Sequence, residues 1–207
     1  MKYILFALNI LPLVSCNEKI YPVIQSEHFS LKNDSIVFAV PIYNYYELAN
    51  YEPHNSNYWV FAKDSVKYFS VFDNELTIFL EKYKTIKRKT ELPFSELEIK
   101  NCFSFLARGS VDSLRNYLNS LDNKSESKSY KTAFLKVDFV MNKGTGASGL
   151  GPMGNFSPFG NYYVYFFVVS GNKLVYFNSM RRVASFFNRF YTPKRSRNTI
   201  KAFFKRI

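Results

Sequence analysis

The sequence predicts an α+β fold, with a mostly antiparallel sheet, central helices and two basic amphipathic C-terminal helices. Three observations lead to this prediction. Short apolar runs bounded by turn-forming residues lie near both ends of the chain, apolar residues recur at helical spacing between them, and amphipathic stripes follow after residue 180. The 22 Phe and 16 Tyr residues predict a core packed with aromatic rings.

The first part of the domain is expected to form strands. Residues 36–40 are a continuous apolar run that ends at Pro41, as in a buried strand. Residues 58–72 are expected to form a hairpin, because two runs rich in aromatic and β-branched residues flank Lys63-Asp64-Ser65.

Helices are expected in the middle of the chain. The first follows Asn74 and places on one face Leu76, Phe79, Leu80 and Tyr83. The second opens with a capping box, in which Ser95 and Glu98 each satisfy a free amide of the other, and ends near Gly109. The third begins at Ser110 and has an apolar face made of Leu114, Tyr117, Leu118 and Leu121.

The last third returns to strands, at residues 133–140, 162–169 and 173–177. Gly171-Asn172 is a two-residue hairpin signal, and the run 162–169 is apolar on both faces, which predicts a central strand covered by helices. Two helices should follow. Their stripes are Val183, Phe186, Phe187 and Phe190 in the first, and Ile200, Phe203, Phe204 and Ile207 in the second.

The N-terminus has the pattern of an export signal. A basic start at Lys2 precedes a run of about ten mostly apolar residues, too short to span a membrane, which closes with Leu13-Val14-Ser15-Cys16. These four residues resemble the lipobox of bacterial lipoprotein precursors. The resemblance covers residues 1–16 alone and implies a lipid on the Cys16 thiol and cleavage just before it. We therefore expect a signal peptide at 1–15, a lipidated N-terminus and tether at 16–33, and a single α+β domain at 34–207.

This resemblance also gives the expected location. The protein should be exported and held in the cell envelope, with the membrane as its partner through the lipid anchor. Asn17 follows the cysteine where an Asp would resemble an inner-membrane retention signal, so the outer membrane is favoured. An exported protein is out of easy reach of nucleic acid, which we do not expect as a partner.

Signals for cofactor, metal or catalytic chemistry are weak. Residues 144–149 match the G-x-G-x-x-G pattern, but the following residues, through Gly154, cannot open the helix that would hold a pyrophosphate. The loop from Gly144 to Gly154 fits a binding loop or lid better. His28 and His54 lack neighbours at metal-ligand spacing, and Cys102 has the setting of a buried helix residue. We expect no cofactor, no metal and no catalytic residue.

A tyrosine-rich segment provides a candidate ligand surface. It reads as a loop between strands, where aromatic rings could stack on sugar rings and polar neighbours could bind hydroxyl groups. The candidate residues are Tyr45, Tyr46, Tyr51 and His54. The alternative is aromatic packing over the sheet.

The charge distribution is strongly uneven. No acidic residue follows Asp138, whereas eleven basic residues do, so that only +1 of the formal +12 belongs to residues 1–138. Candidate contacts to an anionic partner or membrane are Arg181, Arg182, Arg189, Lys194, Arg195, Arg197, Lys201, Lys205 and Arg206. The alternative is that these charges are solvated and that the Phe stripes cover the sheet.

Together these features predict a lipid-anchored cell-envelope protein with a non-catalytic binding or structural role. Its basic C-terminal third would contact an acidic envelope component, a protein or an anionic membrane. Two other hypotheses stay open: an enzyme that acts on envelope glycans or lipids, and an immunity-type lipoprotein that neutralises an incoming toxin.

Overall fold

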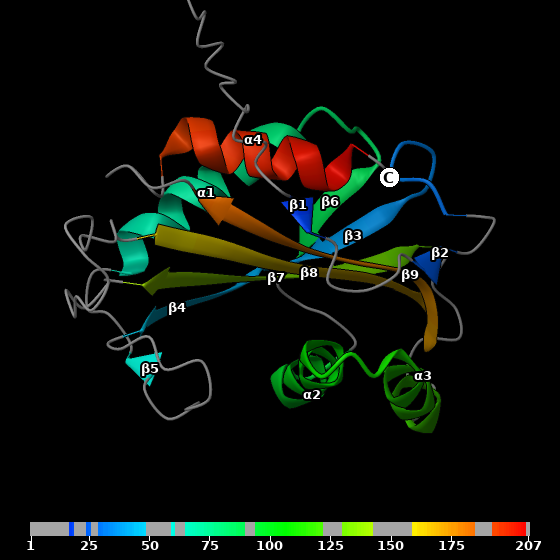
Figure 1. The fold of residues 1–207 in the computed structure, drawn as a ribbon. Coiled ribbons are helices and arrows are strands. Elements are labelled where there is room, and N and C mark those ends of the chain that lie inside the picture. The colour runs from blue at the N-terminus through cyan, green and yellow to red at the C-terminus, as the bar shows by residue number, and fades with distance from the viewer. Residues whose placement is uncertain are drawn as a thin grey trace, which may run out of the picture.

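The computed structural model describes residues 17–18, 24–25, 29–48, 59–60, 65–89, 94–121, 130–142, 159–184 and 192–205. These residues form a mixed α+β fold in which a long twisted sheet has helices on both faces (Figure 1). The strands are β1 (Asn17–Glu18), β2 (Ile24–Gln25), β3 (Ile36–Ala39), β4 (Ile42–Leu48), β5 (Trp59–Val60), β6 (Ile86–Lys89), β7 (Lys131–Asn142), β8 (Phe159–Ser170) and β9 (Lys173–Ala184). The helices are α1 (Ser65–Leu80), α2 (Glu96–Ala107), α3 (Val111–Ser120) and α4 (Pro193–Phe204).

The sheet is mostly antiparallel, as predicted. Its order is β1-β9-β8-β7-β3-β6, with β7, β8 and β9 as a long antiparallel centre. β3 and β4 both run parallel to β7, and β6 adds a parallel edge beside β3. Gly171 turns the β8–β9 hairpin with a φ of 58°, which glycine adopts without steric cost. Central strand β8 is buried on both faces, in agreement with the prediction.

A bulge separates β3 from β4. Phe38 is opposite Ala133 and Ile42 is opposite Lys136, so residues 39–41 face only residues 134–135. Pro41, which has no amide hydrogen to donate to a ladder, is part of this bulge. The extra residue reverses the alternation of side chains, and therefore Tyr43 joins the same side of the core as Phe38.

Helix α1 corrects the predicted hairpin at 58–72. Residues 66–72 are helical, and Phe69 and Phe72 recur at helical spacing against the sheet. Their rings lie 5.6 and 5.7 Å from the ring of Phe139. The aromatic and β-branched content of this segment favours a strand, but burial of one helical face against β4 and β7 outweighs that preference.

Helices α2 and α3 confirm two predicted helices. The Ser95 amide donates to the Glu98 carboxylate at 2.6 Å, and the Glu98 amide donates to the Ser95 hydroxyl at 3.3 Å, which completes the capping box. Gly109, with a φ of 74°, ends α2 and leads to α3. Cys102 is buried under this pair, and burial raises the pKa of its thiol to about 12.

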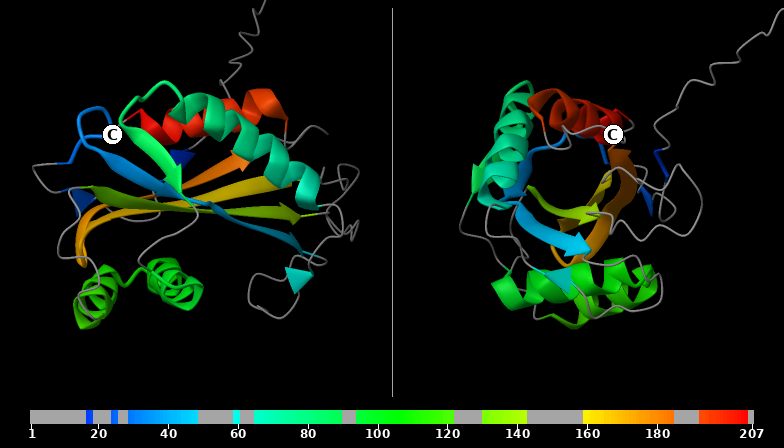
Figure 2. Two further views of the ribbon diagram at one scale, coloured as in Figure 1. Left: turned by 180° about the vertical axis from the view of Figure 1, so that it is seen from behind. Right: turned by 60° about the vertical axis from the view of Figure 1, so that its left-hand side comes forward.

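One of the two predicted C-terminal helices is confirmed. In α4, Ile200, Phe203 and Phe204 are buried, so this stripe covers the sheet. Val183, assigned by sequence to the other helix, belongs to β9 instead, and the rest of that helix's stripe lies outside the described residues. α1 and α4 lie side by side on one face of the sheet, whereas α2 and α3 cover part of the other (Figure 2).

The core begins earlier in the chain than expected. β1 and β2 pair with β9, and the side chains of Phe29 and Leu31 are buried. β1, β2, Phe29 and Leu31 all lie in residues 16–33, which were predicted to be a tether. Cys16 and the predicted signal peptide lie outside the described residues. Among the helices that the structure describes, none has the length and apolar character needed to cross a membrane.

Candidate anion-binding site

An open cavity of about 740 Å³ lies where the C-terminal ends of α1 and α4 meet the loop before β3. It is lined by Ser30, Lys32, Phe79, Tyr83, Lys201, Phe204 and Lys205. Three of these side chains are cationic and none is acidic. The cavity therefore combines a positive rim with aromatic surface, and we call it the lysine pocket.

Aromatic packing fixes the floor of the lysine pocket. The Phe79 ring of α1 stacks on the Phe204 ring of α4, with centroids 5.2 Å apart, and lies 5.5 Å from the Tyr83 ring. Phe204 also meets Phe166 of β8 edge to face at 5.3 Å. Because these rings belong to the hydrophobic core, the floor is held rigidly by the sheet.

The lysines reach the pocket from two distant parts of the chain. Lys201 and Lys205 are one helical turn apart on α4, and Lys32 is on a tight turn whose backbone is held by Asp34. The Asp34 carboxylate accepts the Ser30 amide at 2.7 Å and also binds Lys131 at 2.7 Å. This acid is therefore engaged elsewhere, and within the described residues the three pocket lysines form no ion pair.

The charges of these lysines have two physical consequences. Lys201 and Lys205 at the C-terminal end of α4 interact favourably with the helix dipole. Three like charges around one cavity nevertheless repel each other, and a bound anion would relieve that repulsion. The arrangement can hold a phosphate or carboxylate group by charge-assisted hydrogen bonds.

Arg197 does not belong to this anion site, although its charge suggested a contact. It donates two hydrogen bonds to the Glu75 carboxylate of α1, at 2.7 and 2.9 Å. Glu75 is 4% exposed, and the hydrogen bonds from Arg197 hold its pKa below the ordinary value. The pair attaches α4 to α1, so the Arg197 guanidinium, although exposed, already neutralises a buried carboxylate.

The other predicted basic contacts are divided among several environments. Arg182 donates to the Thr199 hydroxyl at 3.3 Å, and burial lowers its pKa. Arg181 lies over the Tyr163 ring at 5.7 Å. Lys194 and Arg195 are in the first turn of α4, and Lys194 is exposed. Arg189 and Arg206 lie outside the described residues.

The candidate tyrosine surface is also changed by the structure. Tyr45 and Tyr46 lie in β4 and not in a loop. Tyr45 is 1% exposed and stacks on Tyr68 at 5.3 Å, so it packs in the core, as the alternative interpretation had it. Tyr46 is half-buried on the opposite face. Tyr51, His54 and the glycine-rich loop at 144–154 lie outside the described residues.

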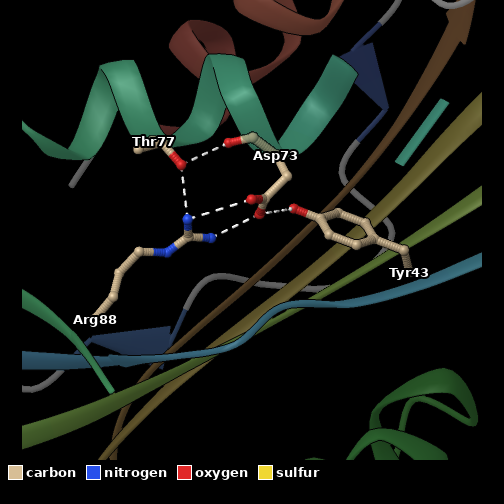
Figure 3. Close-up of polar contacts among 4 residues, drawn as sticks. All are labelled: Tyr43, Asp73, Thr77 and Arg88. Carbon is tan, nitrogen blue, oxygen red and sulfur yellow. Dashed lines mark hydrogen bonds and ion pairs between the residues drawn. The ribbon is translucent and has the colours of Figure 1, made fainter. Parts of the chain in front are cut away.

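A second polar cluster, on α1, consists of four side chains that form hydrogen bonds with one another (Figure 3). Tyr43 donates to the Asp73 carboxylate at 2.8 Å, and Arg88 binds the same carboxylate through both terminal nitrogens, at 2.6 and 3.3 Å. Arg88 also donates to the Thr77 hydroxyl at 2.6 Å. Burial, followed by the nearby Asp73 charge, raises the pKa of Tyr43. This network joins β4 and the edge strand β6 to α1 and is structural.

Comparison with known proteins adds no assignment: the chain matches no known family model and no curated protein. Within the described part of the chain, no group of His, Cys, Asp and Glu is arranged to hold a metal ion. Only some of the residues that line the lysine pocket could be predicted from the sequence. Lys201 and Lys205 were candidates, whereas no local signal marked Lys32, Phe79 or Tyr83, because only the fold brings them to α4.

Proposed function

We propose that this chain is a lipid-anchored cell-envelope protein that binds an anionic envelope component in the lysine pocket, without catalysing a reaction. The observation that carries the proposal is the convergence of Lys32, Lys201 and Lys205 over an aromatic floor. The expected lipid on Cys16 would place this pocket close to a membrane surface.

The chemistry of the pocket favours a phosphate-bearing amphiphile as ligand. Ammonium groups bind phosphate oxygens through short charge-assisted hydrogen bonds. The rings of Phe79 and Phe204 offer apolar surface to the first carbons beyond the phosphate. Lys or Arg side chains near an anionic surface contribute on the order of 1 kcal/mol each, and salt weakens that contribution.

Vesicle binding tests this proposal. The mature chain is mixed with vesicles of phosphatidylcholine containing phosphatidylglycerol, and with vesicles of phosphatidylcholine alone. A variant with Lys32→Gln, Lys201→Gln and Lys205→Gln should bind the anionic vesicles at least tenfold more weakly than the natural chain. The matched control carries Lys67→Gln, Lys173→Gln and Lys194→Gln, which remove three exposed charges outside the pocket, and it should bind normally.

Two results would contradict the proposal. One is equal binding of the natural chain to both kinds of vesicle. The other is an equal loss in the control variant and in the triple variant, because binding would then depend on net charge and not on the pocket. Rising ionic strength should weaken the binding of the natural chain more steeply than that of the triple variant.

A further inference from the structure

The lipid anchor that we expect at Cys16 would have no tether between it and the folded domain. The first residue after the cysteine is already part of the sheet, because Asn17 pairs with Arg182 of β9. Opposed Cα atoms in an antiparallel pair lie about 4.5 to 5.5 Å apart, and consecutive Cα atoms lie about 3.8 Å apart. The Cα atom of Cys16 is therefore within about 10 Å of the Cα atom of Arg182.

Strand β1 places this anchor point beside α4. Arg182 faces the α4 side of the sheet, since its guanidinium donates to the Thr199 hydroxyl of α4 at 3.3 Å. In the right-hand view of Figure 2, β1 lies outside β9 at the edge of the sheet, nearer to α4 than to α2 and α3. The anchor point therefore belongs to the α4 side of the domain.

The lysine pocket lies further along the same helix. Lys201 and Lys205 follow Thr199 by two and six positions, which is a rise of about 3 and 9 Å along the helix axis. Phe204, which lines the pocket, belongs to the same end of α4. The anchor point and the pocket are therefore on one side of the domain, and α4 connects them.

The charge of the helices also distinguishes the two sides of the sheet. Helix α4 holds four basic residues and no acidic one, whereas α2 and α3 together hold three acidic and two basic residues. Glu75, the acid that α4 contacts, is buried and bound to Arg197. An anionic membrane can therefore approach the α4 side with net attraction, and it meets acidic residues on the other side.

We propose that the lysine pocket binds the phosphate headgroup of a lipid in the same membrane that holds Cys16, and that β1 turns α4 toward that membrane. The inference rests on the proposed function, because it needs both the lipid on Cys16 and an anion in the pocket. It adds the source of the anion, which is a lipid of the anchoring membrane and neither a soluble phosphate nor a lipid of an opposing membrane.

Anchoring lowers the affinity that the pocket needs. A pocket held beside the headgroups meets its ligand at an effective concentration in the millimolar range or above, so a weak contact is enough. Three lysines around an open cavity form such a weak site, because ammonium groups bind phosphate as single charges and lack the bidentate geometry of arginine.

The test measures which face of the anchored domain lies near the lipid headgroups. The lipidated chain, with Cys102→Ala, is reconstituted in vesicles of phosphatidylcholine and phosphatidylglycerol that also contain a lipid with a nitroxide on its headgroup. One variant carries a fluorophore at Asn198→Cys, on the exposed face of α4, and the matched control carries it at Ser104→Cys, on the exposed face of α2. The nitroxide should quench the label on α4 about threefold more strongly than the label on α2.

An inserted linker tests the role of β1. About twenty Gly and Ser residues between Cys16 and Asn17 span roughly 25 Å and leave the domain itself unchanged. In vesicles of phosphatidylcholine alone, where no anionic lipid attracts the lysines, stronger quenching on α4 should persist in the natural chain and should be lost with the linker. Equal quenching of the two labels in the natural chain, or a difference that survives the linker, would overturn the proposal.

This inference and the proposed function can fail separately. If the triple lysine variant loses vesicle binding but the α4 label is not preferentially quenched, the pocket binds an anion from elsewhere and only this inference fails. The inference also fails if chains anchored in phosphatidylcholine vesicles join them to protein-free phosphatidylglycerol vesicles through the three lysines, because the pocket would then face away from its own membrane. Equal vesicle binding by the natural chain and the triple variant would instead contradict the pocket itself.

Discussion

Arg197 and Glu75 join the two helices on one face of the sheet through a bidentate ion pair with bonds of 2.7 and 2.9 Å. Glu75 is buried, whereas the Arg197 side chain is 52% exposed, so α4 supplies the cation that a buried acid of α1 requires. Lys201 and Lys205 follow Arg197 by one and two helical turns. The pair therefore also determines where the lysine pocket is formed.

Removing the cation of this pair should destabilise the protein. Arg197→Met leaves the buried Glu75 carboxylate without its main donor, and we expect the melting temperature to fall by about 5 °C at pH 7. Differential scanning fluorimetry would measure the change. Lys194→Met, which also removes a charge from α4, should shift it by no more than about 1 °C. An equal loss in the two variants would mean that the pair contributes no specific stability.

The same variant predicts a pH dependence. Because the pKa of Glu75 is lowered in the folded protein, its contribution to stability is fully present above the ordinary glutamate value of 4.5 and is lost as the pH falls through the folded-state pKa. The difference between the natural chain and Arg197→Met should therefore be largest near pH 7 and should shrink below pH 4.5. A difference that stays constant down to pH 3 would contradict the assignment to Glu75.

The network around Asp73 predicts the effect of a single hydroxyl. Tyr43→Phe keeps the ring stack on Phe69, whose centroid is 5.6 Å away, but removes the 2.8 Å hydrogen bond to Asp73. Urea denaturation should show a loss of about 1 kcal/mol in the free energy of unfolding. In an Asp73→Asn background the same substitution should cost less, because the charged acceptor is gone. Purely additive effects would show that the hydroxyl and the carboxylate are not coupled.

The bulge between β3 and β4 predicts a contrast between deletion and substitution. Val40 is 59% exposed, so Val40→Thr should change stability by less than about 0.5 kcal/mol. Deleting Val40 removes the extra residue and would turn Tyr43 and Tyr45 away from the α1 side of the core. We expect circular dichroism to show loss of the native fold. A folded deletion variant would mean that the sheet can move its register at low cost.

The two cysteines should differ in chemistry. Intact mass of the N-terminal peptide from the membrane fraction should show a lipid on Cys16, and Cys16→Ala should remove it together with membrane association.

Cys102 should resist iodoacetamide at pH 8 in the folded protein, because burial raises its thiol pKa to about 12, and should react after unfolding in urea. An unmodified Cys16 would contradict the lipid anchor, and rapid alkylation of Cys102 would contradict its burial.

Local signals in the sequence predicted much of the fold. The capping box of Ser95 and Glu98 and the turn at Gly171 each depend on residues a few positions apart, and both elements are confirmed. The local propensity of residues 66–72 favours a strand, but the structure has them in a helix. Burial against the sheet favours the helix, and local propensity does not report such burial. The parts of the fold that local signals did not predict depend on pairing between strands that are distant in the sequence.

The predicted site shows the same limit. Charge counting identified the basic C-terminal third, but a solvated arginine and one bound to a buried acid look alike in sequence, as Arg197 demonstrates. Lys32 joins Lys201 only because the turn before β3 packs beside α4. The pairing of Asn44 in β4 with Asp138 in β7 depends on a register that includes the bulge, and no local motif encodes that register.

The parallel half of the sheet also constrains when the chain can fold. Ile36 pairs with Lys131, 95 positions later, whereas β7, β8 and β9 are successive antiparallel neighbours. During synthesis β3 has no partner until β6 and β7 follow, and β4 has only the two-residue strand β5 until β7 is made. Such non-local pairing slows folding. If the chain crosses a membrane unfolded, as the proposed export would require, this delay would leave β3 unpaired until the antiparallel strands can assemble with it.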